Sequence, residues 1–253
     1  MSKTAERDLE LLSLLRLDSH LAVDGVARSL GVSAATVRRD LRRMAAEGRV
    51  VRTYGGAALA ASMQPSPAEV ESLTEKRAIA SVAATLVRDG QTIVISSGTT
   101  TLEFARRLDG RQGLTVITNA LDVAEALLDR DGVELIVLGG TVRPRMHSLL
   151  GHLTDLAAEA LRADVLFMGI SAVSVEHGLL NDYMPEILTD RALARMAARV
   201  IVLADATKFD RLAQAFVFGL TSVDTIVTDW RVRPETVDAL EHAGVKVVVV
   251  NAP

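Results

Sequence analysis

The residues best suited to hold an anion follow five short apolar runs between residues 92 and 204. After TIVIS the chain reads Ser97-Gly98-Thr99-Thr100, which supplies hydroxyl donors and a glycine that lets a ligand approach the backbone. Lys208 follows another run, VIVLA, and would add a positive charge. The other candidates in comparable positions are Asn119, Gly139, Gly140, Arg143 and Gly169. Together these residues predict a site for an anionic group such as a phosphate.

Each of these loops by itself is more typical of an ordinary turn between a strand and a helix than of an anion site. A Gly-Thr pair commonly begins a helix, and a single lysine or arginine in a loop is usually solvated. The recurrence of such residues at several loops is what favours a shared site. None of the loops matches the GxxxxGK[ST] or GxGxxG pattern, so the sequence gives no support for ATP or NAD.

Thiol and metal chemistry have little support. The chain has no cysteine, which excludes disulfides, thiolate zinc sites, iron–sulfur clusters and a cysteine nucleophile. The five histidines are scattered, and His147 and His152 form no recognised ligand set. We therefore expect no cofactor and no metal.

Alternating helix and strand patterns must position the candidate loops. The expected helices are 74–88, 100–108, 120–129, 152–161, 187–199 and 234–243. The expected strands are 92–96, 114–118, 133–138, 164–168, 200–204, 224–228 and 245–250. This alternation predicts an α/β domain with a mostly parallel sheet, in which ligands bind beyond the carboxyl ends of the strands.

A second chemically capable group is the set of arginines near the N-terminus. A first helix is expected at about 5–17, and Asp24 is expected to cap a second helix that ends at a Gly31 turn. Ser33 then caps a third helix, 34–47, whose buried stripe carries few of the arginines. Residues 50–56 predict a small β-wing.

This arrangement predicts a winged helix-turn-helix, because one α-helix fits the major groove of DNA and arginine contacts both guanine and phosphate. A solvated helix face is the alternative for RRDLRR, but the preceding Gly turn and Ser cap favour the DNA reader. The candidate contacts are Ser33, Thr36, Arg38, Arg39, Arg42, Arg43, Arg49, Arg52 and Tyr54.

The distribution of charge supports this division. The chain of 253 residues has a net charge of −4, but residues 1–60 carry ten Lys/Arg against seven Asp/Glu, or about +3, and the rest carries about −7. We expect a DNA-binding domain at 1–57, a linker at 58–72 and a second domain at 73–253. The apolar runs are far shorter than a membrane span, and the first residues lack a signal-peptide pattern, so a cytoplasmic protein is expected.

The segment VSAATVRRDLRRMAAEGRVVRTYGGA resembles the DNA-binding signature of the DeoR/GlpR family of bacterial transcription regulators. The effector domain of the same family is resembled by the segments EKRAIASVAATLVRDGQTIVISSGTTTLEFARRL, LTVITNALDVAEAL, VLGGTVR and VIVLADATKFDR. The resemblance implies a fold similar to ribose-5-phosphate isomerase that senses phosphorylated sugars or related metabolites. It implies that the loop 97–100, the pair 139–140 and Lys208 bind the effector.

Two segments depart from the family pattern. Residues 179–186 read LLNDYMPE, and the loop after Gly140 carries Arg143, Arg145 and His147. Because loops carry ligand specificity, we expect these two segments to determine which effector binds. Solvated loops, or packing of Tyr183 and Met184 against another subunit, are the alternatives.

The predicted function is an effector-responsive regulator, most simply a repressor of carbohydrate genes. Its expected partners are double-stranded operator DNA, a phosphorylated sugar or related effector, and further copies of itself, because one small module reads little DNA. The alternative is an isomerase-like enzyme fused to a DNA-binding module. The segment 168–172, where a related isomerase would carry its acids, has none, so no catalytic residue is assigned.

Overall fold

The computed structural model of the chain describes residues 3–17, 20–47, 49–53, 56–59 and 72–253. The chain divides into two compact units, Met1–Glu71 and Ser72–Pro253. Most of the predicted linker, 58–72, lies outside the described residues, although a strand includes its first two positions.

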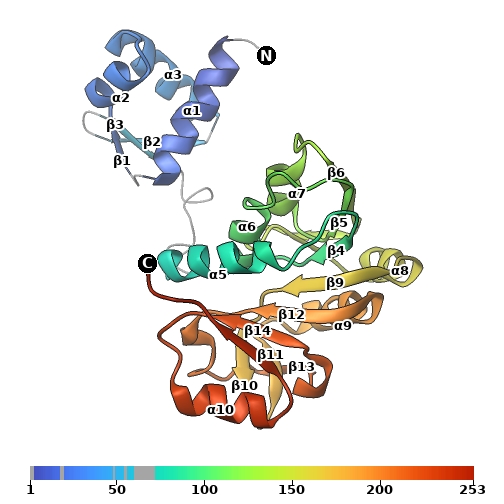
Figure 1. Cartoon of the computed structure of the whole chain (residues 1–253). Helices are drawn as coiled ribbons and strands as arrows, with labels where there is room; N and C mark the ends of the chain where they lie inside the picture. The colour runs from blue at the N-terminus through green and yellow to red at the C-terminus, as the bar shows by residue number, and fades with distance from the viewer. Residues whose placement is uncertain (1–2, 18–19, 48, 54–55, 60–71) are drawn as a thin grey trace. The chain divides into compact units, whose positions relative to one another are not determined.

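The first unit is a three-helix module with a β-wing (Figure 1). Its elements are α1 (Lys3–Leu17), β1 (His20–Ala22), α2 (Val23–Ser29), α3 (Ala34–Ala46), β2 (Val50–Thr53) and β3 (Gly56–Leu59). The three strands form an antiparallel sheet in the order β1-β3-β2. Its core joins Leu11 and Leu15 of α1 to Val37, Leu41 and Met44 of α3, as the apolar spacing predicts.

Two local predictions for this unit have different outcomes. Gly31 adopts a φ of +62°, so the tight turn before α3 uses a conformation that glycine tolerates best. The prediction that Asp24 caps the second helix is wrong. The cap is Ala22, two residues earlier, so the helix begins at Val23 and Asp24 lies inside its first turn.

The second unit is built on a seven-stranded, entirely parallel sheet in the order β15-β14-β12-β9-β4-β5-β6. Its strands are β4 (Thr92–Ile95), β5 (Leu114–Thr118), β6 (Val133–Val137), β9 (Ala163–Met168), β12 (Ala197–Leu203), β14 (Thr225–Thr228) and β15 (Lys246–Val249). Each overlaps one of the strands expected from the sequence, and the expected α/β fold is confirmed.

Helices cover both faces of the sheet (Figure 1). They are α5 (Leu73–Thr85), α6 (Thr99–Ala105), α7 (Leu121–Leu127), α8 (His152–Ala160), α9 (Ile187–Met196) and α10 (Pro234–His242). Side chains of α5, α6 and α7 share one hydrophobic core, and those of α8, α9 and α10 share the other. In β4, Ile93 and Ile95 enter the first core and Val94 the second, which explains why the strands are continuous apolar runs.

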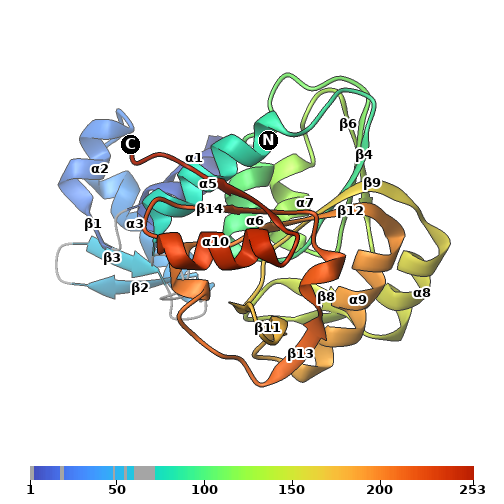
Figure 2. The same cartoon turned by 60° about the horizontal axis from the view of Figure 1, so that its bottom comes forward.

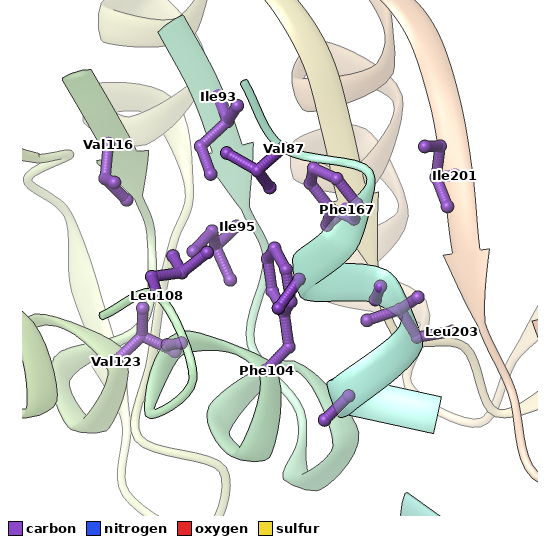
Figure 3. Close-up of a cluster of buried hydrophobic side chains, with 14 of the residues drawn as sticks. Val87, Ile93, Ile95, Phe104, Leu108, Val116, Val123, Phe167, Ile201 and Leu203 are labelled. Carbon is purple, nitrogen blue, oxygen red and sulfur yellow. The ribbon is translucent and has the colours of Figure 1, made fainter. Parts of the chain in front are cut away.

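The first core is centred on a pair of phenylalanines, shown in Figure 3. Phe104 of α6 and Phe167 of β9 have ring centroids 4.4 Å apart at an interplanar angle of 31°. Both side chains are fully buried. Phe104 lies in the last turn of α6, so this contact packs the helix against the centre of the sheet.

Short strands that the sequence reading did not predict lie at the edge of this unit. The hairpin β7 (Thr141–Arg143) and β8 (Ser148–Leu150) follows β6. The strands β10 (Ala172–Ser174), β11 (Gly178–Asn181) and β13 (Ala215–Phe218) form a small antiparallel sheet, and Figure 2 shows β11 and β13 side by side near α9. Three 3-10 turns complete the unit: η1 (Met184–Glu186), η2 (Ala206–Lys208) and η3 (Leu220–Ser222).

Candidate functional site

The start of α3 has the predicted polar cap. The Ser33 hydroxyl accepts a hydrogen bond from the Thr36 backbone N–H at 3.1 Å, and the two hydroxyl oxygens are 2.8 Å apart. The cap satisfies a donor that the helix itself cannot, and it leaves both side chains at the N-terminal end of α3.

Three arginines lie on the exposed side of α3. Arg38, Arg39 and Arg42 are exposed, whereas the stripe that contains Leu41 is buried. Arg38 has a distant ion pair with Asp24 at 3.8 Å, and both side chains are more than half exposed, so that pair contributes little. Arg52 is exposed on β2, and Tyr54 lies outside the described residues.

Arg43 and Arg49 have a different environment from the other predicted DNA contacts. Arg43 Nη2 lies 2.6 Å from Asp8 Oδ1, and Arg49 Nη1 lies 3.4 Å from Asp8 Oδ2. The hydrogen bond to Asp8, a buried residue of α1, raises the pKa of Arg43. A parallel pair joins Arg7 Nε to the buried Asp40 at 2.7 Å. The Arg43–Asp8 and Arg7–Asp40 ion pairs stabilise the packing of α1 on α3. The sequence did not indicate this role of Arg43, because the paired residues are far apart in the chain.

The anion-site candidates gather where the strand order of the large sheet reverses. From β4 the chain adds β5 and β6 on one side, then returns to place β9, β12, β14 and β15 on the other. The carboxyl ends of the adjacent strands β4 and β9 therefore flank the position at which ligands bind in open α/β sheets. The loop Ser97–Thr100 follows β4 and Gly169 follows β9.

The two loops are in direct contact at this point. The Gly169 N–H donates to Ser96 Oγ at 3.2 Å. A Cβ added to Gly98, whose φ is +148°, would lie 3.8 Å from the Gly169 Cα and 3.1 Å from Thr101 Oγ1. The first hydrogen bond of α6 joins the Leu102 N–H to the Gly98 carbonyl, so the N–H groups of the preceding threonines have no acceptor within the helix.

Asn119 positions the loop after β4. Its side chain is almost fully buried, accepts from the Ser97 N–H at 3.3 Å and donates to the Leu149 carbonyl at 3.0 Å. Both ends of the amide are used, so Asn119 links β4, β5 and β8. It holds Ser97 in place rather than facing an open space.

Gly139 and Gly140 follow β6 at the same edge of the sheet. The Gly139 carbonyl accepts from Thr154 Oγ1 at 2.6 Å. Gly140 has a φ of +139°, and a Cβ there would lie 2.1 Å from Thr154 Oγ1 and 2.8 Å from the Leu150 carbonyl oxygen. A glycine is therefore required at position 140 because β8 and α8 pack closely against its backbone, not because a ligand does.

Arg143 is held by a carboxylate that the sequence reading did not select. Its Nη1 lies 2.6 Å from Glu186 Oε2, and its guanidinium carbon lies 3.9 Å from the centre of the Tyr183 ring. Glu186 Oε1 accepts from Ser148 Oγ at 3.0 Å and from Ser97 Oγ at 3.4 Å. The two segments that depart from the family pattern therefore meet beside the predicted site. The only sequence signal for Glu186 was its place in the segment 179–186.

A second carboxylate lies one turn after Glu186. Asp190 is buried and accepts from Asn181 Nδ2 at 2.8 Å. Burial, followed by the nearby negative charge of Glu186, raises the pKa of Asp190 to about 7. The strand-end segment 168–172 lacks acids, but the structure brings two carboxylates to this region from α9 and the turn before it.

Lys208 ends the η2 turn that follows β12. Asp205, which is buried, begins the turn and accepts from the Thr207 N–H at 3.1 Å. The Lys208 side chain is partly exposed, and no described residue forms an ion pair with it. The loops that carry Lys208, Gly169, Ser97, Asn119 and Gly139 therefore follow five neighbouring strands, in that order, at one edge of the sheet.

The described residues give no evidence of two other kinds of site. No group of three or more His, Asp or Glu side chains among them could hold a metal ion. Within the same part of the chain, no helix has the length and apolar character needed to cross a membrane.

Two family models match the chain. The DeoR-like helix-turn-helix domain matches residues 7–63, and the DeoR C terminal sensor domain matches residues 71–230. The chain belongs to the DeoR family. This DeoR-family chain is 32% identical to a putative aga operon transcriptional repressor of Escherichia coli O157:H7, over 98% of the chain and 94% of that protein. It is 34% identical to a lactose phosphotransferase system repressor of Lactococcus lactis, over 91% of the chain and 93% of that protein.

A weaker likeness in structure was also found. Ribose 5-phosphate isomerase A of Methanocaldococcus jannaschii matches 55% of the DeoR-family chain and 55% of its own length, with a TM-score of 0.42 and 18% identity.

Proposed function

We propose that the protein is a transcriptional repressor of carbohydrate genes that reads operator DNA through α3. The observation that carries this proposal is the row of exposed arginines, Arg38, Arg39 and Arg42, on the side of α3 away from the core. The names of its relatives, which include repressors of the aga operon and of a lactose phosphotransferase system, support the same reading. The protein would act on the chromosome, in the cytoplasm.

The residues of the first unit would have two different roles. Ser33, Thr36 and the exposed arginines of α3 would contact bases and nearby phosphates, and Arg52 of the wing would contact the backbone. Arg43 and Arg49 are already held by Asp8, so we assign them mainly to the packing of α1 on α3.

Salt-dependent binding distinguishes these two roles. Replacing Arg42 with Gln removes one phosphate contact and should lower the slope of log K against log salt by roughly 1, for every DNA sequence alike. Arg43→Gln, its neighbour and matched control, should instead lower the stability of the first unit and leave the slope nearly unchanged. Equal slopes for wild type and Arg42→Gln would refute the placement of α3 on DNA.

We propose further that a phosphorylated sugar or related metabolite binds at the carboxyl edge of the large sheet. Supporting observations are the contact of Gly98 with Gly169 at the strand-order reversal and, at the same edge, Lys208, with which no described residue forms an ion pair. A thermal-shift screen of sugar phosphates tests this, because a ligand at 100 times its Kd stabilises its domain by about 2.7 kcal/mol. The absence of any hit among sugar phosphates would count against this class of effector.

The protein would act as a dimer or larger oligomer, because repeated half-sites are read by symmetric assemblies. We consider two arrangements of the oligomer, one that binds operator DNA well and one that binds it poorly. The effector can shift the balance between them only by the difference between its affinities for the two. Sedimentation at equilibrium, with and without operator DNA, measures the stoichiometry directly.

The carboxylates Glu186 and Asp190 favour one second candidate, an isomerase activity of the sensor domain. A buried acid whose pKa is about 7 is suited to general base catalysis at neutral pH. Binding is preferred because Asp190 already accepts a hydrogen bond from Asn181 and Glu186 is paired with Arg143. Sustained interconversion of aldose and ketose phosphates at enzyme-like rates would reverse this preference.

A further inference from the structure

The carboxylate of Glu186 already occupies donors that an anionic effector would need. The Glu186 side chain is only 6% exposed. Its Oε1 accepts from Ser97 and Ser148, at 3.4 Å and 3.0 Å, and its Oε2 accepts from Arg143 at 2.6 Å. Two hydroxyls and one guanidinium are a typical donor set for a phosphate or carboxylate group.

These donors come from two parts of the chain that are distant in sequence. Ser97 belongs to the loop after β4, while Arg143 and Ser148 belong to the β7–β8 hairpin. Arg143 is further fixed by stacking on Tyr183. The donors are therefore oriented in advance, and Glu186 is the side chain that fills the space between them.

An incoming anion and Glu186 cannot use the same donors together. Arg143 is the one cation that contacts Glu186 among the described residues, and it balances a single negative charge. A second negative charge is unfavourable in this region. Asp190 lies one turn after Glu186, and its burial together with the charge of Glu186 raises its pKa. A phosphate within hydrogen-bond distance of Ser97 and Arg143 would repel the carboxylate that they now hold.

We propose that Glu186 is an internal occupant of the effector site, which the anionic group of the effector displaces from Ser97 and Arg143. This inference rests on the proposed function, in that it assumes an anionic effector at the edge of β4. Glu186 is thus a residue that determines affinity, because only a ligand anion that outcompetes a tethered carboxylate can bind.

The displacement has a direct structural consequence. Glu186 ends η1 and immediately precedes α9, whose first turn packs on α8 through the hydrogen bond from Thr189 Oγ1 to Asp155. Expulsion of the carboxylate removes the hydrogen bonds that join the start of α9 to Ser97, Ser148 and Arg143, and we expect the backbone there to move. Binding at the loop after β4 is therefore transmitted to the α8–α9 face, which exposes Leu153, Leu156 and Leu188.

Titration calorimetry of the full chain with inorganic phosphate, and separately with a sugar phosphate, tests the proposal. Glu186→Gln removes the competing charge and should bind inorganic phosphate at least about tenfold more tightly than wild type. Glu176→Gln, which removes an exposed acid from the β10–β11 turn, is the matched control and should bind like wild type. If Glu186→Gln does not fold, Glu186→Asp, whose shorter side chain reaches fewer donors, should show the same gain to a smaller extent.

The outcomes separate this inference from the proposed function. Sugar-phosphate binding by wild type, with no gain in phosphate affinity for Glu186→Gln, overturns the displacement and leaves the effector class standing. A loss of sugar-phosphate affinity in Glu186→Gln overturns it too, because Glu186 would then be a ligand contact. Failure of every protein to bind either anion overturns both. Faster amide exchange at residues 187–190 of wild type on adding phosphate would support the displacement, and unchanged exchange would oppose it.

Discussion

Replacement of the buried Asp190 by asparagine should change how the stability of the sensor domain depends on pH. In the folded chain the pKa of Asp190 is raised from 3.8 to about 7. Because each tenfold change in proton affinity is worth about 1.4 kcal/mol, this rise in pKa corresponds to about 4 kcal/mol in the free energy of unfolding. The folded state retains its proton where the unfolded chain has lost it. The Asp190 contribution is therefore fully present below about pH 4 and is lost as the pH rises to about 7.

The expected result is a stability advantage of Asp190→Asn that shrinks as the pH falls. Near pH 8 the wild type carries a buried charge, so Asp190→Asn should be the more stable protein, by up to about 4 kcal/mol less the cost of rearranging the hydrogen bond from Asn181. Near pH 4 most of this advantage should disappear, because Asp190 is then neutral in the folded state and close to its ordinary pKa of 3.8 in the unfolded chain.

Urea denaturation followed by tryptophan fluorescence measures this in the sensor domain alone. The single tryptophan of the chain, Trp230, packs against the first hydrophobic core of this domain. Midpoints would be compared from pH 4 to pH 8 for wild type, Asp190→Asn and the exposed-site control Glu176→Gln. A stability difference between Asp190→Asn and wild type that is the same at every pH, or a loss of stability at pH 8, would refute the reasoning.

Three further substitutions test the packing that positions the two sites. Gly140→Ala should destabilise the sensor domain by about 1–3 kcal/mol in urea melts, because its Cβ would overlap the Thr154 hydroxyl, whereas Gly139→Ala, with nothing within 4 Å, should be nearly neutral. Phe104→Ala should cost about 3–5 kcal/mol in the same melts, and a loss under about 1 kcal/mol would contradict its central place in the core. Ser33→Ala should cost the first unit about 1 kcal/mol in thermal melts followed by circular dichroism, and an unchanged midpoint would dispute the cap.

The regular parts of the fold could be predicted because their patterns are local. Strands buried on both faces appear as short apolar runs, and the Ser33 cap lies next to the helix it begins. The boundary between α9 and β12 could not be placed in the same way. Residues 197–199 were expected to be helical, yet Ala197 and Arg199 pair with β9, so tertiary contacts override helix propensity.

The small antiparallel sheet and the Glu186 cluster depend on contacts that the sequence does not display. Strands of three or four residues, such as β10 and β11, are too short to show a period of two. Glu186 lies 89 residues from Ser97 and 43 from Arg143, so no local spacing could reveal their hydrogen bonds. The strand-end loops could be listed from the sequence, but the carboxylate among them could not.

The most direct test of the account is the response of operator binding to effector, measured by fluorescence anisotropy of the full chain on DNA from upstream of its own gene. A sugar phosphate identified by thermal shift should release wild-type protein from this DNA. Thr99→Ala and Lys208→Ala should bind the DNA as tightly as wild type but require more effector for release. Release of both variants at the wild-type effector concentration would contradict the assignment of the effector site to the carboxyl edge of the sheet.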